Sequence, residues 1–144
     1  MSGGITIRPV EEADLPALPS LLAQLGYPMA AEEAARRLAA VLAAPGHAVL
    51  VAVRDGAVLG LMHLFLRPAL EKPPEVVVQA LVVEAGLRGS GLGGQLLRAA
   101  EDWARTRGLD AITLDTGAAN TGARALYAAV GYQDEDIRMT KRLV

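Results

Sequence analysis

The sequence contains no cysteine among its 144 residues. This absence excludes disulfide bonds, thiolate metal sites and a cysteine nucleophile, and it is compatible with a reducing compartment. Aromatic residues make up only 3% of the chain, so leucine, valine and alanine must supply most of the 52% hydrophobic content. We expect one domain over residues 1–144, because a chain of this length is typical of a single hydrophobic core.

A strong excess of charge is also missing. The formal net charge is −2 and the pI is about 5.7, so the composition shows no electrostatic footprint for nucleic acid. No apolar run approaches the length needed to span a bilayer, and the first residues lack a charged-then-apolar signal pattern. We therefore expect a cytoplasmic protein with no nucleic-acid partner, no membrane partner and no bound metal.

A glycine-rich stretch stands between an apolar run, 76–83, and a segment with helical spacing of apolar residues up to Trp103. Backbone N–H groups at the start of a helix are unpaired, and the helix dipole places partial positive charge there. Glycine lets an anion approach these groups closely, and an arginine adds a fixed charge. The pattern predicts a pyrophosphate site made of Arg88, Gly89, Ser90, Gly91, Leu92, Gly93 and Gly94.

Two kinds of ligand are compatible with these glycines. Gly89, Gly91 and Gly94 satisfy the dinucleotide pattern G-x-G-x-x-G, with Asp115 at the end of the next strand as the ribose-binding acid. A full doubly wound sheet plus a substrate region would need a longer chain, so length argues against a small dinucleotide-binding module. The other pattern in the same stretch is R-x-x-G-x-G, from Arg88 to Gly93.

Periodicity and turn signals predict an α/β fold in the order β-α-α-β-β-β-α-β-α-β(-β). The mixed sheet has six or seven strands, with about four helices on both faces. Pro19 predicts a late or irregular start for the first helix, and Asp55-Gly56 predicts a hairpin turn. The expected strands are 5–8, 48–54, 57–66, 76–83, 109–115 and one or two in 132–144; the expected helices are 15–25, 32–44, 92–107 and 121–130.

A second motif follows downstream, with Asn120 at the start of an amphipathic helix and Gly131 at its end. Tyr127 shares a helix face with apolar residues, so a core aromatic is one interpretation of it. The pattern N-x-x-A-x-x-L-Y-x-x-x-G-Y, together with R-x-x-G-x-G, resembles the GNAT superfamily of N-acetyltransferases over essentially the whole chain. The segment 25–28, Leu-Gly-Tyr-Pro, most resembles the branch of aminoglycoside 6′-N-acetyltransferase-like proteins.

The resemblance implies transfer of an acetyl group from acetyl-CoA to a primary amine of a small molecule or peptide by direct attack. It implies that the loop 88–94 holds the pyrophosphate, and that Asn120 and Tyr127 contact the pantetheine arm and thiol. The backbone of Leu81, Val82 and Val83 would bind the pantetheine amides. Tyr127 would act as general acid for the thiolate, and the N–H of Leu81 would stabilise the oxyanion.

The sequence departs from the family where many members carry a glutamate as general base. Gln79 occupies this place and cannot accept a proton. Glu75 or His63 could act as base through water, although a solvated strand end and a core histidine are competing interpretations, and His47 is interpreted as a loop residue. The missing base leaves open a non-catalytic acyl-CoA-binding regulator on the same fold.

The acceptor is not identified by the sequence. The first helices and the loops above the sheet form the acceptor pocket in this family, which makes Tyr27, Phe65, Glu71, Glu75 and Gln79 candidate substrate-binding residues. The length of the acyl chain and the formation of a homodimer also stay open.

Overall fold

The structure is a computed structural model, and it describes residues 4–115, 121–135 and 138–143. Its elements in chain order are β1 (Thr6–Pro9), the 3-10 helix η1 (Glu12–Ala17), α1 (Leu18–Leu25), α2 (Ala31–Ala43), β2 (His47–Arg54), β3 (Ala57–Arg67), β4 (Glu75–Val83), the 3-10 helix η2 (Ala85–Leu87), α3 (Leu92–Thr106), β5 (Ile112–Leu114) and α4 (Thr121–Ala129).

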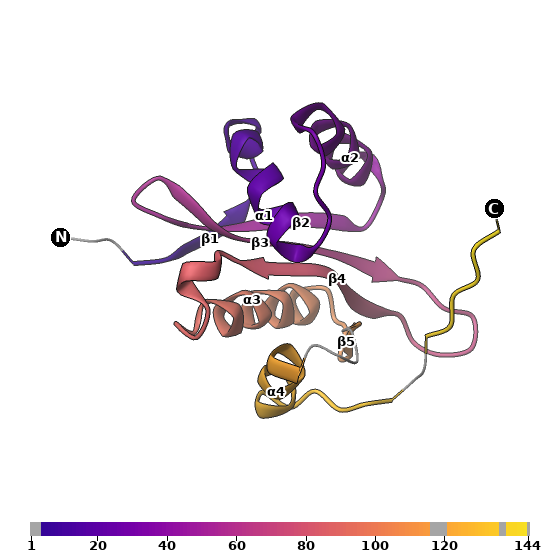
Figure 1. Cartoon of the computed structure of the whole chain (residues 1–144). Helices are drawn as coiled ribbons and strands as arrows, with labels where there is room; N and C mark the ends of the chain where they lie inside the picture. Colours follow the sequence, from indigo (N-terminus) through magenta and orange to yellow (C-terminus); the bar gives the residue numbers. More distant parts are fainter. Residues whose placement is uncertain (1–3, 116–120, 136–137, 144) are drawn as a thin grey trace.

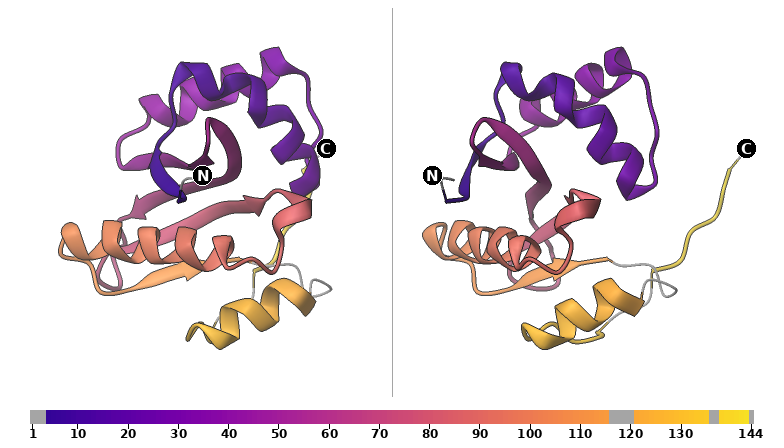
Figure 2. Two further views of the ribbon diagram at one scale, coloured as in Figure 1. Left: turned by 90° about the vertical axis from the view of Figure 1, so that its left-hand side faces the viewer. Right: turned by 60° about the vertical axis from the view of Figure 1, so that its left-hand side comes forward.

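A mixed sheet with strand order β1-β2-β3-β4-β5 runs through the molecule (Figure 1). Strands β1 to β4 pair antiparallel, whereas β4 and β5 pair parallel because α3 connects them as a crossover. Helices α1 and α2 cover one face, and α3 and α4 lie on the other side (Figures 1 and 2). The expected α/β class with helices on both faces is confirmed.

The expected number of strands is wrong by one or two. The described part of the chain forms five strands, and its segments 132–135 and 138–143 contain none. Met139 and Leu143 are each 88% exposed, and Arg138 forms an exposed ion pair with Asp115. Apolar residues that bury nothing give a strand little to gain from pairing.

Two apolar clusters hold the layers together. Between the sheet and α3, the fully buried side chains include Met62 and Leu64 of β3 and Leu96 of α3. On the opposite face, Leu18 and Leu21 of α1 pack against the central strands. The sheet is therefore apolar on both faces, as its nearly continuous apolar strands predict.

Proline and glycine residues lie at the start and end of α1 and in the hairpin turn, as expected from the sequence. Pro19 lies in the first turn of α1, where its missing N–H costs nothing, and Gly26 closes that helix at φ +112°. Asp55 and Gly56 both have positive φ in the turn between β2 and β3.

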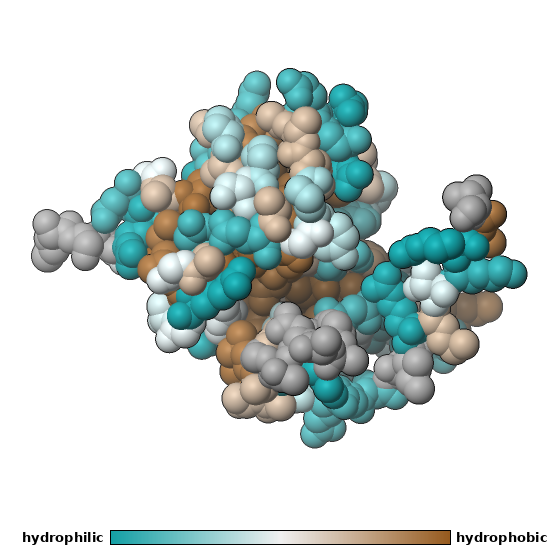
Figure 3. All heavy atoms as spheres, viewed as in Figure 1, coloured by the Kyte–Doolittle hydropathy of each residue, from teal (hydrophilic) through white to brown (hydrophobic). Residues whose placement is uncertain are grey.

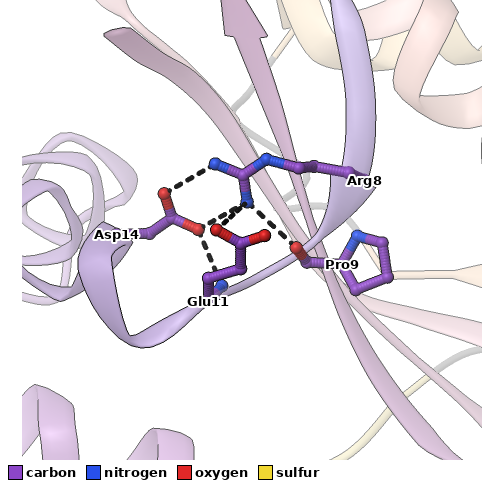
Figure 4. A network of polar contacts seen from close by, with 4 residues as sticks. All are labelled: Arg8, Pro9, Glu11 and Asp14. Atoms are coloured by element: carbon purple, nitrogen blue, oxygen red, sulfur yellow. Dashed lines mark hydrogen bonds and ion pairs between the residues drawn. The ribbon is translucent and has the colours of Figure 1, made fainter. Parts of the chain in front are cut away.

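An ion pair anchors the corner between β1 and η1, just before α1 (Figure 4). Arg8 donates to both carboxylate oxygens of Asp14, at 2.7 and 3.0 Å, and the backbone N–H of Glu11 donates to Asp14 at 2.7 Å. Asp14 is 5% exposed, and the bond from Arg8 lowers the pKa of its carboxyl group. This contact sets the direction in which the chain leaves β1 towards α1.

Candidate active site

The central feature of the site is the place where β4 and β5 part. Their pairing ends at Val78 and Leu114, while β4 continues to Val83. The same place carries a β-bulge, because His63 pairs with Ala80 and Leu64 pairs with Val78, which leaves Gln79 as an extra residue on β4. Beyond the bulge, β4 keeps its partners on β3 but has no strand partner on its other edge among the described residues. This edge is open to an extended ligand.

The glycine loop lies at the end of the same strand. Gly89 and Gly91 have φ of +86° and +89°, a region that other residues rarely adopt, and Gly91 caps the start of α3. The first bond of the helix runs from the N–H of Gln95 to Gly91. The N–H groups of Leu92, Gly93 and Gly94 donate to no group in the described part of the chain, so they can bind an anion.

Helix α4 packs against the start of α3. The nearest atom to a Cβ built on Gly93 is Cδ2 of Leu126, at 3.3 Å, followed by a methyl group of Val83. Tyr127, the next residue on α4, is half-buried, and burial raises the pKa of its hydroxyl group. Tyr127 therefore holds its proton at neutral pH, as a general acid must.

Tyr132 follows the glycine that ends α4. Its ring meets Tyr127 edge-on, with centroids 6.1 Å apart, and its hydroxyl is buried without a partner in the described residues. Burial, with a contribution from Glu101, raises the pKa of Tyr132 to about 12. In Figure 3, apolar surface is exposed in the hollow between the sheet and α4.

Glu75 is buried at the start of β4, not a solvated strand end. Arg67, opposite it on β3, donates a hydrogen bond to its carboxylate, and Lys72 lies 3.4 Å away. The bond from Arg67 is the main reason that the pKa of Glu75 lies below its usual value. Two cations thus neutralise the carboxylate.

A histidine pair lies on the α1/α2 face of the sheet. His47 is the first residue of β2, and its Nδ1 lies 2.9 Å from Nε2 of His63 on β3. The ring of Phe65 stacks on His47, with centroids 4.8 Å apart. Sequence analysis missed this pair, because it treated His47 as a loop residue. No local signal could have found it, because a bulge between β2 and β3 sets the register that brings both histidines to one face.

A further contact joins α1 to the start of the glycine loop. Gln24 accepts a hydrogen bond from the N–H of Ala85 at 2.8 Å and donates one to Glu84 at 2.6 Å. Gln24 is not among the residues predicted from the sequence. Its position in α1, four residues after Ser20 and next to Leu25, carries no local signal.

The remaining candidates occupy four places. Gln79 is exposed at the bulge, and Phe65 and His63 lie across from β4 on β3. Tyr27, 62% exposed, follows α1, and Glu71 is exposed between β3 and β4. Asn120 lies outside the described residues. Within those residues, no three acidic or histidine side chains come close enough to hold a metal ion, and no helix is long and apolar enough to cross a membrane.

Comparison with known proteins agrees with this geometry. Residues 12–132 match the sequence model of the Acetyltransferase (GNAT) family. The chain is 30% identical over 141 residues to aminoglycoside N(6′)-acetyltransferase type 1 of Klebsiella aerogenes, covering 93% of each protein. The chain belongs to the GNAT family. Members of this family are acetyl-CoA-dependent acyltransferases, so the chain is an N-acetyltransferase.

Two further matches are consistent with the GNAT assignment. Aminoalkylphosphonate N-acetyltransferase of Salmonella typhimurium is 34% identical over 94 residues, covering 65% of this chain and 61% of that protein. The solved structure of aminoglycoside N-acetyltransferase AAC(6′)-Iy in complex with CoA superposes with a TM-score of 0.85 at 21% identity, covering 98% and 96% of the two chains. The GNAT sheet, with one parallel pair, is not the doubly wound parallel sheet of a dinucleotide-binding module.

Proposed function

We propose that this GNAT protein transfers an acetyl group from acetyl-CoA to a primary amine of a small molecule. The observation that carries the proposal is that two binding features follow each other along the chain: the open edge of β4 and the start of α3. Within the described residues, β4 has no strand partner on one edge after Gln79, and this edge leads directly to N–H groups of Leu92, Gly93 and Gly94 that donate to no group there. A ligand with an extended amide arm and a pyrophosphate fits this order of groups.

Each part of the loop and strand has a chemical task in this proposal. The backbone of Leu81, Val82 and Val83 would pair with the amides of the arm, as an added strand does. The exposed Arg88, held by a 3.4 Å bond from its Nε to the carbonyl of Val83, would add positive charge beside the pyrophosphate. Gly89 and Ser90 would complete the loop around it.

The chemical step needs an oxyanion donor and an acid. The amine nitrogen forms a bond to the thioester carbonyl, and the N–H of Leu81 would stabilise the negative charge on its oxygen. When the carbon–sulfur bond breaks, Tyr127 would give its proton to the departing thiolate. The raised pKa of Tyr127 supports this task, because the hydroxyl group is protonated in the neutral range.

The names of the relatives support an amine acceptor of small size, since one is named for aminoglycosides and another for aminoalkylphosphonates. The acceptor would lie among Tyr27, Phe65, Glu71, Glu75 and Gln79. Glu75 is paired with two cations, Arg67 and Lys72, so this group of three side chains carries a net charge of +1. That balance favours a monoamine, or an amine that also carries an anionic group, over a polycation.

Calorimetry with acetyl-CoA, CoA and NAD tests the ligand, and release of CoA in a screen of primary amines tests the reaction. A thiol reagent can detect the released CoA without background, because the protein has no cysteine. We expect micromolar-range binding of acetyl-CoA, none of NAD, and amine-dependent thiol release. Binding of acetyl-CoA without release of CoA for any amine would favour the non-catalytic acyl-CoA-binding regulator. The observation that supports this alternative is the amide side chain of Gln79 at the bulge, which cannot act as a base.

A further inference from the structure

The histidine pair stands one strand away from the place where chemistry is proposed. His63 is the β3 partner of Ala80, and Ala80 follows Gln79 in the bulge where β4 and β5 part. His63 and His47 lie on the face opposite α3, the face that α1 and α2 cover. An acceptor amine among the candidate residues of that face would therefore approach the imidazoles.

The pair has the electrostatics of a neutral base. Burial, and then the nearby His47, lower the pKa of His63, so its imidazole is uncharged at neutral pH. Two imidazolium ions 2.9 Å apart would repel each other strongly, so protonation of one ring disfavours protonation of the other.

Other charged groups around the pair do not compete for this task. On the same face, Arg67 and Lys72 are both paired with Glu75. Helix α1 carries no charged residue, and in α2 Glu33 pairs with both Arg36 and Arg37, with Glu32 exposed at the start of that helix. Glu75 itself is a poor base, because its lowered pKa favours the ionised form that its two cations already hold.

We propose that His47 and His63 act together as the proton acceptor for the amine, in place of the carboxylate that Gln79 does not supply. This proposal rests on the proposed acetyl transfer. His63 takes the proton, and His47 is a positioning residue that fixes its ring and its tautomer. Phe65, stacked on His47, holds that second ring in place.

The tautomer adopted in the hydrogen bond between the rings decides which nitrogen is basic. If Nε2 of His63 carries the proton and donates to Nδ1 of His47, then Nδ1 of His63 is bare and can accept a proton. In the reaction the nitrogen–carbon bond forms, the carbon–sulfur bond breaks and the thiolate takes its proton from Tyr127. The proton that the amine loses goes to Nδ1 of His63, and exchange with water restores both groups.

Variants at the two positions separate the role of the base from the role of the positioning residue. Each replacement side chain imitates one ring nitrogen and removes the other. His63→Gln keeps a donor near the place of Nε2 but removes the basic Nδ1. His47→Asn keeps an oxygen acceptor near the place of Nδ1, whereas His47→Phe keeps the ring and loses the acceptor. The measurement is kcat/KM for one accepted amine between pH 5.5 and 9.5, by release of CoA, with circular dichroism to confirm folding.

Wild type should level off above the pKa of the pair and stay level up to the pKa of the amine. His63→Gln should lose about 100-fold at pH 7, the usual scale for general base catalysis. Its rate should then rise tenfold per pH unit, because only amine already neutral in solution reacts. His47→Phe should lower kcat with little change in the KM for acetyl-CoA. The kcat of His47→Asn should be much closer to that of wild type. A level profile in His63→Gln would overturn the role of the pair while leaving the acetyl transfer intact, and failure of every amine with wild type would overturn both proposals.

Nuclear magnetic resonance supplies a second test that needs no activity. The chain has only two histidines, so the imidazole signals of the free protein report on this pair alone. We expect a shared first protonation, with the second at a clearly lower pH, and one dominant tautomer at neutral pH. Two independent titrations near pH 6.5 with mixed tautomers would overturn the pair.

Discussion

Substituting valine for Gly93 tests the anion-binding loop most directly. Gly93 is the second residue of α3, and its φ lies outside the left-handed region, so a side chain causes no backbone strain there. Gly91, at φ +89°, would be strained by valine whatever its role. Side chains in a helix tilt towards its N-terminus, so the methyl groups of a valine at position 93 would lean towards the free N–H groups.

The expected loss follows from the hydrogen bonds that the anion can no longer make. A charge-assisted bond contributes roughly 1.5–3 kcal/mol, and holding the pyrophosphate away from two N–H groups should cost about 3–6 kcal/mol of binding. The Kd for acetyl-CoA should therefore rise by roughly 100-fold to 10,000-fold. The new Cβ also meets Leu126 at 3.3 Å, so we expect overpacking to lower the free energy of unfolding by about 1–3 kcal/mol.

Calorimetry with acetyl-CoA and thermal unfolding separate these two effects. Gly86→Ala is the matched control: Gly86 precedes the loop and a Cβ there would meet no atom within 4 Å, so this variant should bind acetyl-CoA as wild type does. The double variant Gly93→Val/Leu126→Ala removes the clash with α4, yet binding should stay weak. If that double variant recovers wild-type affinity, the loss came from displacing α4, and the assignment of the loop as the pyrophosphate site is wrong.

Three other changes test the acid, the anchoring ion pair and the core. Tyr127→Phe should lower kcat about 100-fold or more with little change in KM for acetyl-CoA, as steady-state kinetics would show. Asp14→Ala should lower the free energy of unfolding in urea by about 1–3 kcal/mol at pH 7, because it removes a buried carboxylate that accepts two bonds from the part-exposed Arg8. Gly60→Ala should cost about 1–3 kcal/mol, because its Cβ would lie 3.0 Å from Leu96, and much less in a Leu96→Ala background, by urea denaturation.

Each of these three has an internal check. An unchanged kcat in Tyr127→Phe would mean that this tyrosine is only a packing residue. The pKa of Asp14 is lowered in the folded state, so its stabilisation is present above the unfolded value near 4 and is lost as the pH falls through the folded pKa. Asp14→Ala should lack that acid-dependent loss. Equal costs of Gly60→Ala in both backgrounds would show that Leu96 is not the obstacle.

Much of the fold could be predicted because its signals are properties of single residues. Pro19 cannot donate a hydrogen bond, so the chain forms the 3-10 helix η1 before α1 begins at Leu18. Gly26 and Gly131 end their helices with positive φ, and Asp55-Gly56 turns the hairpin. The prediction of strands in 132–144 was wrong for the opposite reason. Strand formation depends on a pairing partner, and the local sequence does not identify that partner.

The sequence by itself determined the loop 88–94, the order of the elements and the apolar faces, because backbone limits and hydrophobic periodicity act over a few residues. Only the tertiary structure decided which side chains meet. A two-residue turn at 55–56 would alone place His47 opposite Leu64, with His63 on the other face. A bulge between β2 and β3 shifts the register by one residue and brings both histidines to one face. The bulge at Gln79 acts in the same way on β4, because strand register is set by packing across the whole sheet.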